Sequence, residues 1–110
     1  MKRGDIVTVA AGGGYGSKPR PAVVIQSDAF ALTGSITIAL LTSRDVGAPL
    51  VRVPVPVDDS AGLSVESFVM LDKLITVPRN KVKPTSGRLS PMRMRDIDRA
   101  AIIFLGLVGR

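Results

Sequence analysis

The chain has 110 residues, a net charge of +6, 45% hydrophobic residues, and neither histidine nor cysteine. This length predicts one domain spanning residues 1–110. The two missing residue types exclude disulfides, zinc–thiolate sites, paired-imidazole ribonucleases and hydrolases of the Ser-His-Asp or Cys-His kind. The positive charge favours a polyanion, an acidic protein segment or a membrane surface as partner. The high apolar content favours a surface that faces a partner or a second copy of the chain.

The two ends of the chain give no sign of export or of membrane insertion. Lys2 and Arg3 are followed by Gly4 and Asp5 rather than by the apolar core of a signal peptide. The longest apolar run, residues 100–108, has nine residues and is too short to span a bilayer. We therefore expect a cytoplasmic protein that does not enter a membrane.

Strand patterns dominate the first two thirds of the chain. β-Branched apolar runs bounded by glycine, proline and small polar residues are typical of strands. The runs that fit lie at residues 5–10, 21–27, 35–41 and 67–77, the last as one long or two short strands. Residues 12–17 form a glycine-rich loop between the first two.

The segment 51–57 predicts an edge strand. Its valines alternate with other residues, so they share one face of an extended chain. Pro54 and Pro56 lack amide donors that would point to the same side, so the segment can pair through hydrogen bonds along one edge only.

The last third is expected to contain an irregular connection and one helix. Pro78, Pro84 and Gly87 predict irregular backbone over 78–87. Ser90 followed by Pro91 is typical of a helix start. Beyond it, an apolar stripe recurs at helical spacing: Ile97, Ala101, Phe104 and Val108, with Ala100 and Leu107 beside them. The predicted fold is mainly β, a small, partly closed barrel of antiparallel strands with a C-terminal α-helix.

Arginine and hydroxyl groups are the remaining candidates for chemistry. The glycine-rich segment leads into a strand, whereas a phosphate-binding loop leads into a helix. The adjacent carboxylates Asp58 and Asp59 lie in a predicted turn, so we expect no metal site and no cofactor. Arg20 lies between Pro19 and Pro21, which stiffen the backbone that carries it. A stiffly mounted guanidinium suits the capture of phosphate oxygens.

The order of these motifs resembles the MazF/PemK (Kid) family of toxins from type II toxin–antitoxin systems. The resemblance begins with residues 2–7 (KRGDIV), the glycine-rich loop and residues 18–25 (KPRPAVVI). It continues through residues 36–43, 62–77 and the C-terminal helix, and so covers nearly the whole chain. It implies an SH3-like barrel that forms a homodimer, cleaves single-stranded RNA in a sequence-selective way and is neutralised by a cognate antitoxin.

The resemblance also implies a mechanism and a set of site residues. The expected reaction needs no metal and leaves 2′,3′-cyclic phosphate and 5′-OH ends. Arg20 corresponds to the central catalytic residue at the cleaved phosphate. Thr42 corresponds to a catalytic hydroxyl, with Ser43 as its close alternative. The expected RNA-binding residues are Tyr15, Ser17, Lys18, Ser43, Asp72 and Lys73.

The chain departs from the family pattern at two positions. Tyr15 stands where many relatives have a glutamate. Met70 stands where some relatives have an arginine that pairs with the acidic residue two positions later, here Asp72. Either departure would reduce activity or alter the preferred RNA sequence.

Two other functions remain open at this point. One is a gyrase-inhibiting toxin of the CcdB kind, which the pair Arg20 and Thr42 disfavours. The other is a non-catalytic RNA-binding barrel, which the low aromatic content of 4% disfavours. Residues 73–99 carry eight basic and two acidic residues, a net charge of +6, and would face RNA, an acidic part of the antitoxin, or solvent.

Overall fold

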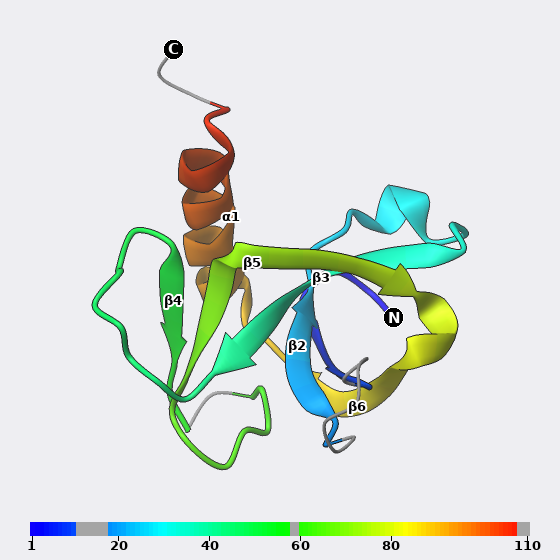
Figure 1. The fold of residues 1–110 in the computed structure, drawn as a ribbon, viewed down its shortest axis with the longest axis horizontal. Helices are drawn as coiled ribbons and strands as arrows, with labels where there is room; N and C mark the ends of the chain where they lie inside the picture. Colours follow the sequence, from blue (N-terminus) through cyan, green and yellow to red (C-terminus); the bar gives the residue numbers. More distant parts are fainter. Residues whose placement is uncertain (11–17, 58–59, 108–110) are drawn as a thin grey trace.

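Six antiparallel strands and a helix make up the fold in the computed structural model, which describes residues 1–10, 18–57 and 60–107 (Figure 1). The strand order in the sheet is β4-β5-β3-β2-β1-β6. The strands are β1 (Asp5–Val9), β2 (Arg20–Val24), β3 (Ser35–Thr42), β4 (Arg52–Val55), β5 (Ser67–Pro78) and β6 (Val82–Arg88). The 3-10 helices η1 (Asp28–Phe30) and η2 (Arg79–Lys81) precede β3 and β6, and α1 (Pro91–Leu105) follows β6. The predicted mainly β fold with a C-terminal helix is confirmed.

The sheet curves strongly and buries apolar side chains on both of its faces. One cluster lies between the sheet and α1, and includes Ile6, Val23, Leu41, Val69, Leu71 and Ile97. The other lies on the opposite face, and includes Val7, Ala22, Val24, Ile36, Ile38 and Val82. Neighbouring residues of one strand, such as Ala22 and Val23, thus enter different clusters. This explains why the inner strands read as continuous apolar runs rather than as alternating ones.

The segment around Pro54 is an edge strand, as predicted. Among the described residues β4 pairs with β5 alone, and Pro54 lies opposite Phe68. Val53 and Val55 are buried in the cluster under α1, whereas Val57 lies beyond the strand and is exposed.

The prediction of an irregular connection over residues 78–87 was wrong. Residues 82–88 form strand β6, which pairs with β1, with a register irregularity between Asp5 and Val7. The Thr85 hydroxyl donates to the Ile6 carbonyl and accepts from the Gly87 amide, which holds the backbone at this irregularity. The strand therefore depends on partners far away in sequence, and its own prolines and glycine gave no period-2 pattern to detect.

The helix begins as predicted but packs over a shorter length. The Ser90 hydroxyl accepts from the Arg93 amide, and Gly106 closes the helix in the left-handed conformation. Ile97 and Ala100 are buried, while Phe104, which we expected on the packed stripe, is 47% exposed. Figure 1 shows the reason, because the C-terminal half of α1 projects past the sheet. Val108 of the predicted stripe is outside the described residues, and no described helix is long and apolar enough to cross a membrane.

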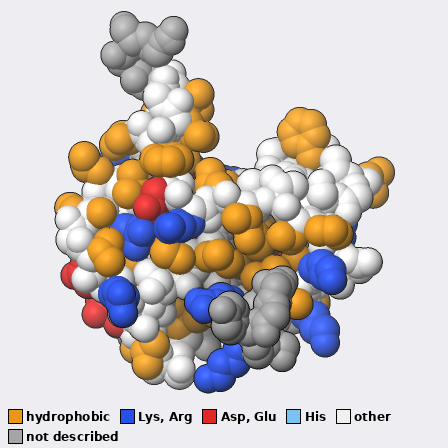
Figure 2. Space-filling view, viewed as in Figure 1, with side chains coloured by type: hydrophobic (Ala, Val, Ile, Leu, Met, Phe, Trp, Pro, Cys, Tyr) orange, Lys and Arg blue, Asp and Glu red, His pale blue; other side chains and the backbone are white. Residues whose placement is uncertain are grey.

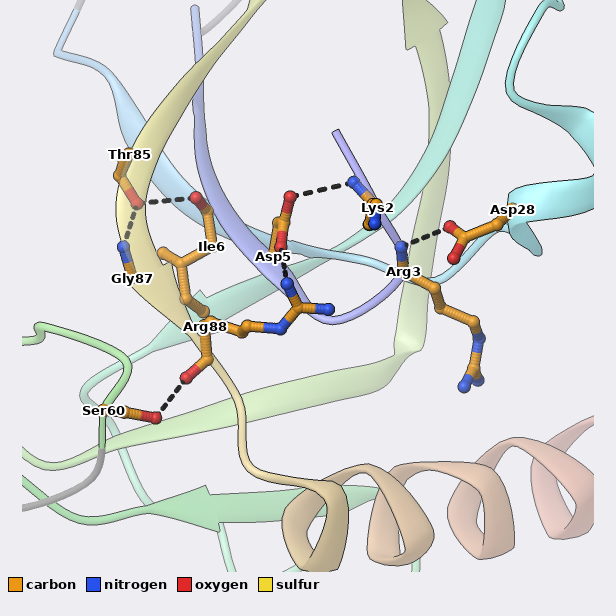
Figure 3. A network of polar contacts seen from close by, with 9 residues as sticks. All are labelled: Lys2, Arg3, Asp5, Ile6, Asp28, Ser60, Thr85, Gly87 and Arg88. Carbon is orange, nitrogen blue, oxygen red and sulfur yellow. Dashed lines mark hydrogen bonds and ion pairs between the residues drawn. The ribbon is translucent and has the colours of Figure 1, made fainter.

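The N-terminal motif ties several elements together (Figure 3). The backbone amide of Arg3 donates to Asp28 at η1, and its side chain donates to the Ile25 carbonyl and to Asp98 of α1. Asp5 accepts from the Lys2 amide and lies 3.4 Å from the Arg88 guanidinium. The motif that opens the chain is therefore architectural, since it fixes β1 against β2, β6 and the helix.

Gly87 is expected to tolerate no side chain. A Cβ atom added there would lie 1.9 Å from the Ala61 carbonyl oxygen, and backbone atoms cannot yield as a flexible side chain can. We expect Gly87→Ala to lower the free energy of unfolding by about 1–3 kcal/mol, as overpacking does elsewhere. Chemical denaturation measures this loss.

Gly34→Ala is the matched control, because a Cβ at Gly34 meets nothing within 4 Å. Its free energy of unfolding should change by less than about 1 kcal/mol. Equal stability of the two variants would contradict the tight contact at Gly87.

Candidate active site

The register of three neighbouring strands brings Arg20 close to Thr42. On β2 and β3, Ala22 lies opposite Leu40 and Val24 opposite Ile38. Extending this register by two residues places Arg20 opposite Thr42. On the other side, Arg20 is paired with Val9 of β1. Arg20, the first residue of β2, and Thr42, the last residue of β3, thus lie side by side although they are more than twenty positions apart in the sequence.

Arg20 and Thr42 line one cavity. Its volume is about 270 Å³, and its other lining residues are Pro21, Leu41, Ser43, Val65 and Ser67. Three of the residues expected at the site, Arg20, Thr42 and Ser43, are therefore gathered in one place. Arg20 and Ser43 are exposed and Thr42 is half-buried, so the groups are open to a ligand from solvent.

The hydroxyl groups of this cavity differ in what they can donate. Thr42 Oγ1 accepts a hydrogen bond from the Arg44 amide at 3.2 Å, so its own hydrogen is available to a ligand. Ser67 is 5% exposed and donates to the Val65 carbonyl at 3.0 Å. Sequence reasoning did not identify Ser67 as a site residue. Its place one residue before the strand partner of Thr42 follows from the register of β3 and β5, which the sequence does not show.

Four other predicted site residues lie elsewhere or outside the described chain. Tyr15 and Ser17 fall in the segment that the structure does not describe. Lys18 is exposed two residues before Arg20, and Lys73 is exposed on β5. Neither lysine lines the cavity.

Asp72 is held by an arginine that sequence reasoning did not associate with it. Arg52 on β4 donates to Asp72 through Nε at 2.7 Å and through Nη2 at 3.0 Å. Arg52 lies opposite Met70, so β4 supplies a guanidinium beside the position where some relatives carry an arginine. Hydrogen bonding from Arg52 lowers the pKa of Asp72, and partial burial opposes this shift. The pKa of Arg52 is raised by the same hydrogen bond.

The basic stretch 73–99 does not form one continuous surface. Arg79 donates to the carbonyls of Thr33 and Phe30, and Arg88 pairs with Asp5. Lys81 and Lys83 line a separate cavity of about 400 Å³ next to Thr8 and Pro19. Part of the charge therefore stabilises the fold, and part lies near the Arg20 end of β2.

The cavity at Arg20 is suited to an anion with several oxygens. A charged guanidinium and a hydroxyl with a free hydrogen can bind different oxygens of one phosphate group. In the part of the chain that the structure describes, no three His, Cys, Asp or Glu side chains gather where they could share an ion. The chemistry that this site offers is hydrogen bonding and positive charge at a phosphate.

The sequence of the chain matches a known family. Residues 2–105 match a family described as PemK-like, MazF-like toxin of type II toxin–antitoxin system. The chain is 45% identical to a probable endoribonuclease MazF of Mycolicibacterium smegmatis over 109 residues, which cover 99% of this chain and 100% of the relative.

Structure comparison gives the same fold. An endoribonuclease in complex with its cognate antitoxin from a mycobacterial species superposes with a TM-score of 0.82 at 21% identity, covering 100% of this chain and 99% of the other. The MazE–MazF complex of Deinococcus radiodurans superposes with a TM-score of 0.79 at 21% identity, covering 96% of each chain.

Removal of the Asp72 carboxylate should destabilise the chain in a pH-dependent way. The pKa of Asp72 is lower in the folded than in the unfolded chain, so its pair with Arg52 stabilises the fold at neutral pH. This contribution is lost as the pH falls through the lowered pKa. Asp72→Asn should cost about 1 kcal/mol at neutral pH, since both side chains are partly exposed, and the cost should shrink in acid.

Urea denaturation over a series of pH values measures this difference. Asp96→Asn is the control, because its ion pair with Arg93 is long at 3.9 Å. A deficit in Asp72→Asn that stays constant down to strongly acidic pH would contradict the role given to the ion pair.

Proposed function

Because the chain belongs to the PemK-like, MazF-like toxin family of type II toxin–antitoxin systems, we propose that it is a sequence-selective endoribonuclease toxin. Its substrate is single-stranded RNA, chiefly mRNA in the cytoplasm, and a cognate antitoxin neutralises it. The observation that carries the proposal is the shared cavity of Arg20 and Thr42. The 45%-identical relative is itself named a probable endoribonuclease.

The proposed reaction is an attack by a ribose 2′-OH on the adjacent phosphorus. A bond forms from the 2′ oxygen to phosphorus, and the bond from phosphorus to the 5′ oxygen breaks. The products carry a 2′,3′-cyclic phosphate and a 5′-OH. The 2′-OH loses one proton and the leaving 5′ oxygen gains one, so no net proton is released. DNA lacks the 2′-OH and is therefore not cut.

Arg20 and Thr42 stabilise the charge that builds up on the phosphate during this attack. The Arg20 guanidinium donates to non-bridging oxygens and supplies positive charge, so the reaction needs no metal ion. The Thr42 hydroxyl donates to another non-bridging oxygen. Its oxygen accepts from the Arg44 amide, and its own hydrogen is therefore left for the phosphate. Ser43 lies at the rim of the same cavity and extends the hydrogen-bonding surface for RNA.

The apolar surface of α1 supports a homodimer. Ile102, Ile103, Phe104 and Leu105 are each 37–52% exposed on consecutive positions of the projecting helix end. Figure 2 shows hydrophobic side chains along the helix and, in a larger group, over the middle of the face below the gap between the helix and the turn that carries η1. Consecutive residues of a helix point in different directions, so this helix end is apolar around much of its circumference, and exposed apolar surface of this kind is usually covered by another chain. The antitoxin is the second proposed partner, since a structural neighbour was solved with its cognate antitoxin.

Arg20→Ala should abolish RNA cleavage while leaving the fold intact. Arg20 is exposed at the start of β2, so its loss removes little packing. Loss of one transition-state charge contact typically costs about 10²–10³-fold in rate. The measurement is cleavage of a long RNA in the presence of EDTA, followed by mapping of the cut ends.

Arg95→Ala is the matched control, because Arg95 is an exposed arginine on α1. It should cleave at the wild-type rate. Cleavage by a folded Arg20→Ala variant near the wild-type rate would remove Arg20 from the mechanism, and a wild-type activity that EDTA stops and magnesium restores would overturn the metal-free chemistry.

Ile103→Asp should convert the proposed dimer into a monomer. Ile103 is 47% exposed on the projecting end of α1, and burying a carboxylate in an apolar interface is costly. Light scattering at about tens of micromolar, a range that detects micromolar dissociation constants, gives the mass. Val57→Asp changes an equally exposed valine after β4 and should leave the dimer unchanged. A monomeric wild-type chain would contradict the proposal.

A further inference from the structure

A second cavity lies beside the cavity of Arg20 and Thr42. It has a volume of about 270 Å³. Its lining residues are Arg52, Pro54 and Phe68, together with Asp45, Gly47, Ala48 and Pro49 of the β3–β4 connection. Thr42 and Phe68 are direct partners in the ladder between β3 and β5. Thr42 lines the first cavity and Phe68 lines the second, so the two cavities are adjacent at this pair.

Phe68 presents its ring on the outer face of the sheet. Its neighbours in sequence and across the strands, Val69, Leu41 and Val53, enter the core under α1. Phe68 therefore points the opposite way, between Thr42 on β3 and Pro54 on β4. Side chains directly opposite each other are about 4.5–5.5 Å apart at their Cβ atoms. The ring is half-buried, so one part of it remains open to a ligand.

Arg52 reaches the same cavity in a fixed orientation. It is diagonal to Phe68 across β4 and β5, a spacing that long and aromatic side chains can bridge. Its Nε and Nη2 atoms donate to Asp72, and this bidentate pair orients the guanidinium plane. The five guanidinium hydrogens exceed the two that Asp72 takes, so hydrogen-bond donors remain for a ligand.

We propose that this cavity is a nucleobase subsite. The base adjoining the cleaved phosphate stacks on the Phe68 ring, and Arg52 donates to a carbonyl oxygen or ring nitrogen on its edge. The inference rests on the proposed function, because the phosphate is the one that Arg20 and Thr42 bind. Unpaired bases stack on aromatic rings, and hydrogen-bonding groups such as a guanidinium recognise their edges. Phe68 and Arg52 supply one group of each kind next to the phosphate site. The RNA preference of the chain is thus set partly by Phe68 and Arg52.

The test uses an oligoribonucleotide that contains one mapped cut site, with each flanking base removed in turn to leave an abasic ribose. For the wild-type chain, removal of the stacked base should lower kcat/KM by about ten- to a hundred-fold. In Phe68→Leu, which keeps most of the apolar volume, the intact and abasic substrates should be cleaved at nearly the same rate. Phe68→Tyr keeps the ring and should retain the discrimination.

Phe30→Leu is the matched control, because Phe30 is an exposed phenylalanine on η1. It should discriminate as the wild type does. Thermal unfolding of each variant shows whether Phe68→Leu is folded. Full discrimination by folded Phe68→Leu would overturn the subsite.

A binding measurement separates this inference from the proposed function. The same oligonucleotides with a deoxyribose at the cut site cannot be cleaved, and fluorescence anisotropy reports their affinity. Weaker binding of one abasic strand to the wild type, absent in Phe68→Leu, supports the subsite even if no RNA is cut. Cleavage that depends on Arg20 together with equal binding of all abasic strands would keep the proposed function and reject the subsite.

Discussion

The register of β2 between β1 and β3 is the constraint on which the site depends. Ala22, Val23 and Val24 are almost completely buried, and they alternate between the two apolar clusters on opposite faces of the sheet. A shift of one residue would exchange the side chains of the two faces and mismatch both clusters. Because burial on both faces fixes this strand, the position of Arg20 at its first residue is fixed as well.

The two motifs that identify the family contribute to this arrangement in different ways. The opening motif holds β1 through hydrogen bonds from Arg3 to η1 and α1 and through an ion pair between Asp5 and Arg88 of β6. Figure 3 shows the contacts to Asp28 and Arg88. The Arg-Pro motif then presents a guanidinium at the end of the neighbouring strand. The first motif stabilises the frame, and the second carries the proposed chemistry. An exposed arginine can hold a fixed position in a chain this small because its strand, rather than its side chain, is rigidly packed.

Charge is used for structure as well as for the proposed binding. Arg79, Arg88 and Arg52 each hold a carbonyl or a carboxylate of the same chain, although two of them lie in or near the basic C-terminal third. Arg52 shows this most clearly, since its pair with Asp72 restores an arginine–acid contact beside Met70. Although Met70 cannot pair with Asp72, this carboxylate still has an arginine partner, which comes from β4 rather than from its own strand β5.

The sequence by itself determined most element types and strand positions, because these follow from the local hydrophobic period. It also determined the edge character of the segment around Pro54 and the helix start at Ser90, which follow from proline chemistry and capping. It also singled out Arg20 and Thr42 through the family resemblance. Only the tertiary structure decided that residues 82–88 form a strand, that Phe104 is exposed, that Ser67 lines the cavity of Arg20 and that Arg52 binds Asp72. Each of these depends on pairing between segments distant in the chain, and such pairing is set by the packing of the whole sheet rather than by neighbouring residues.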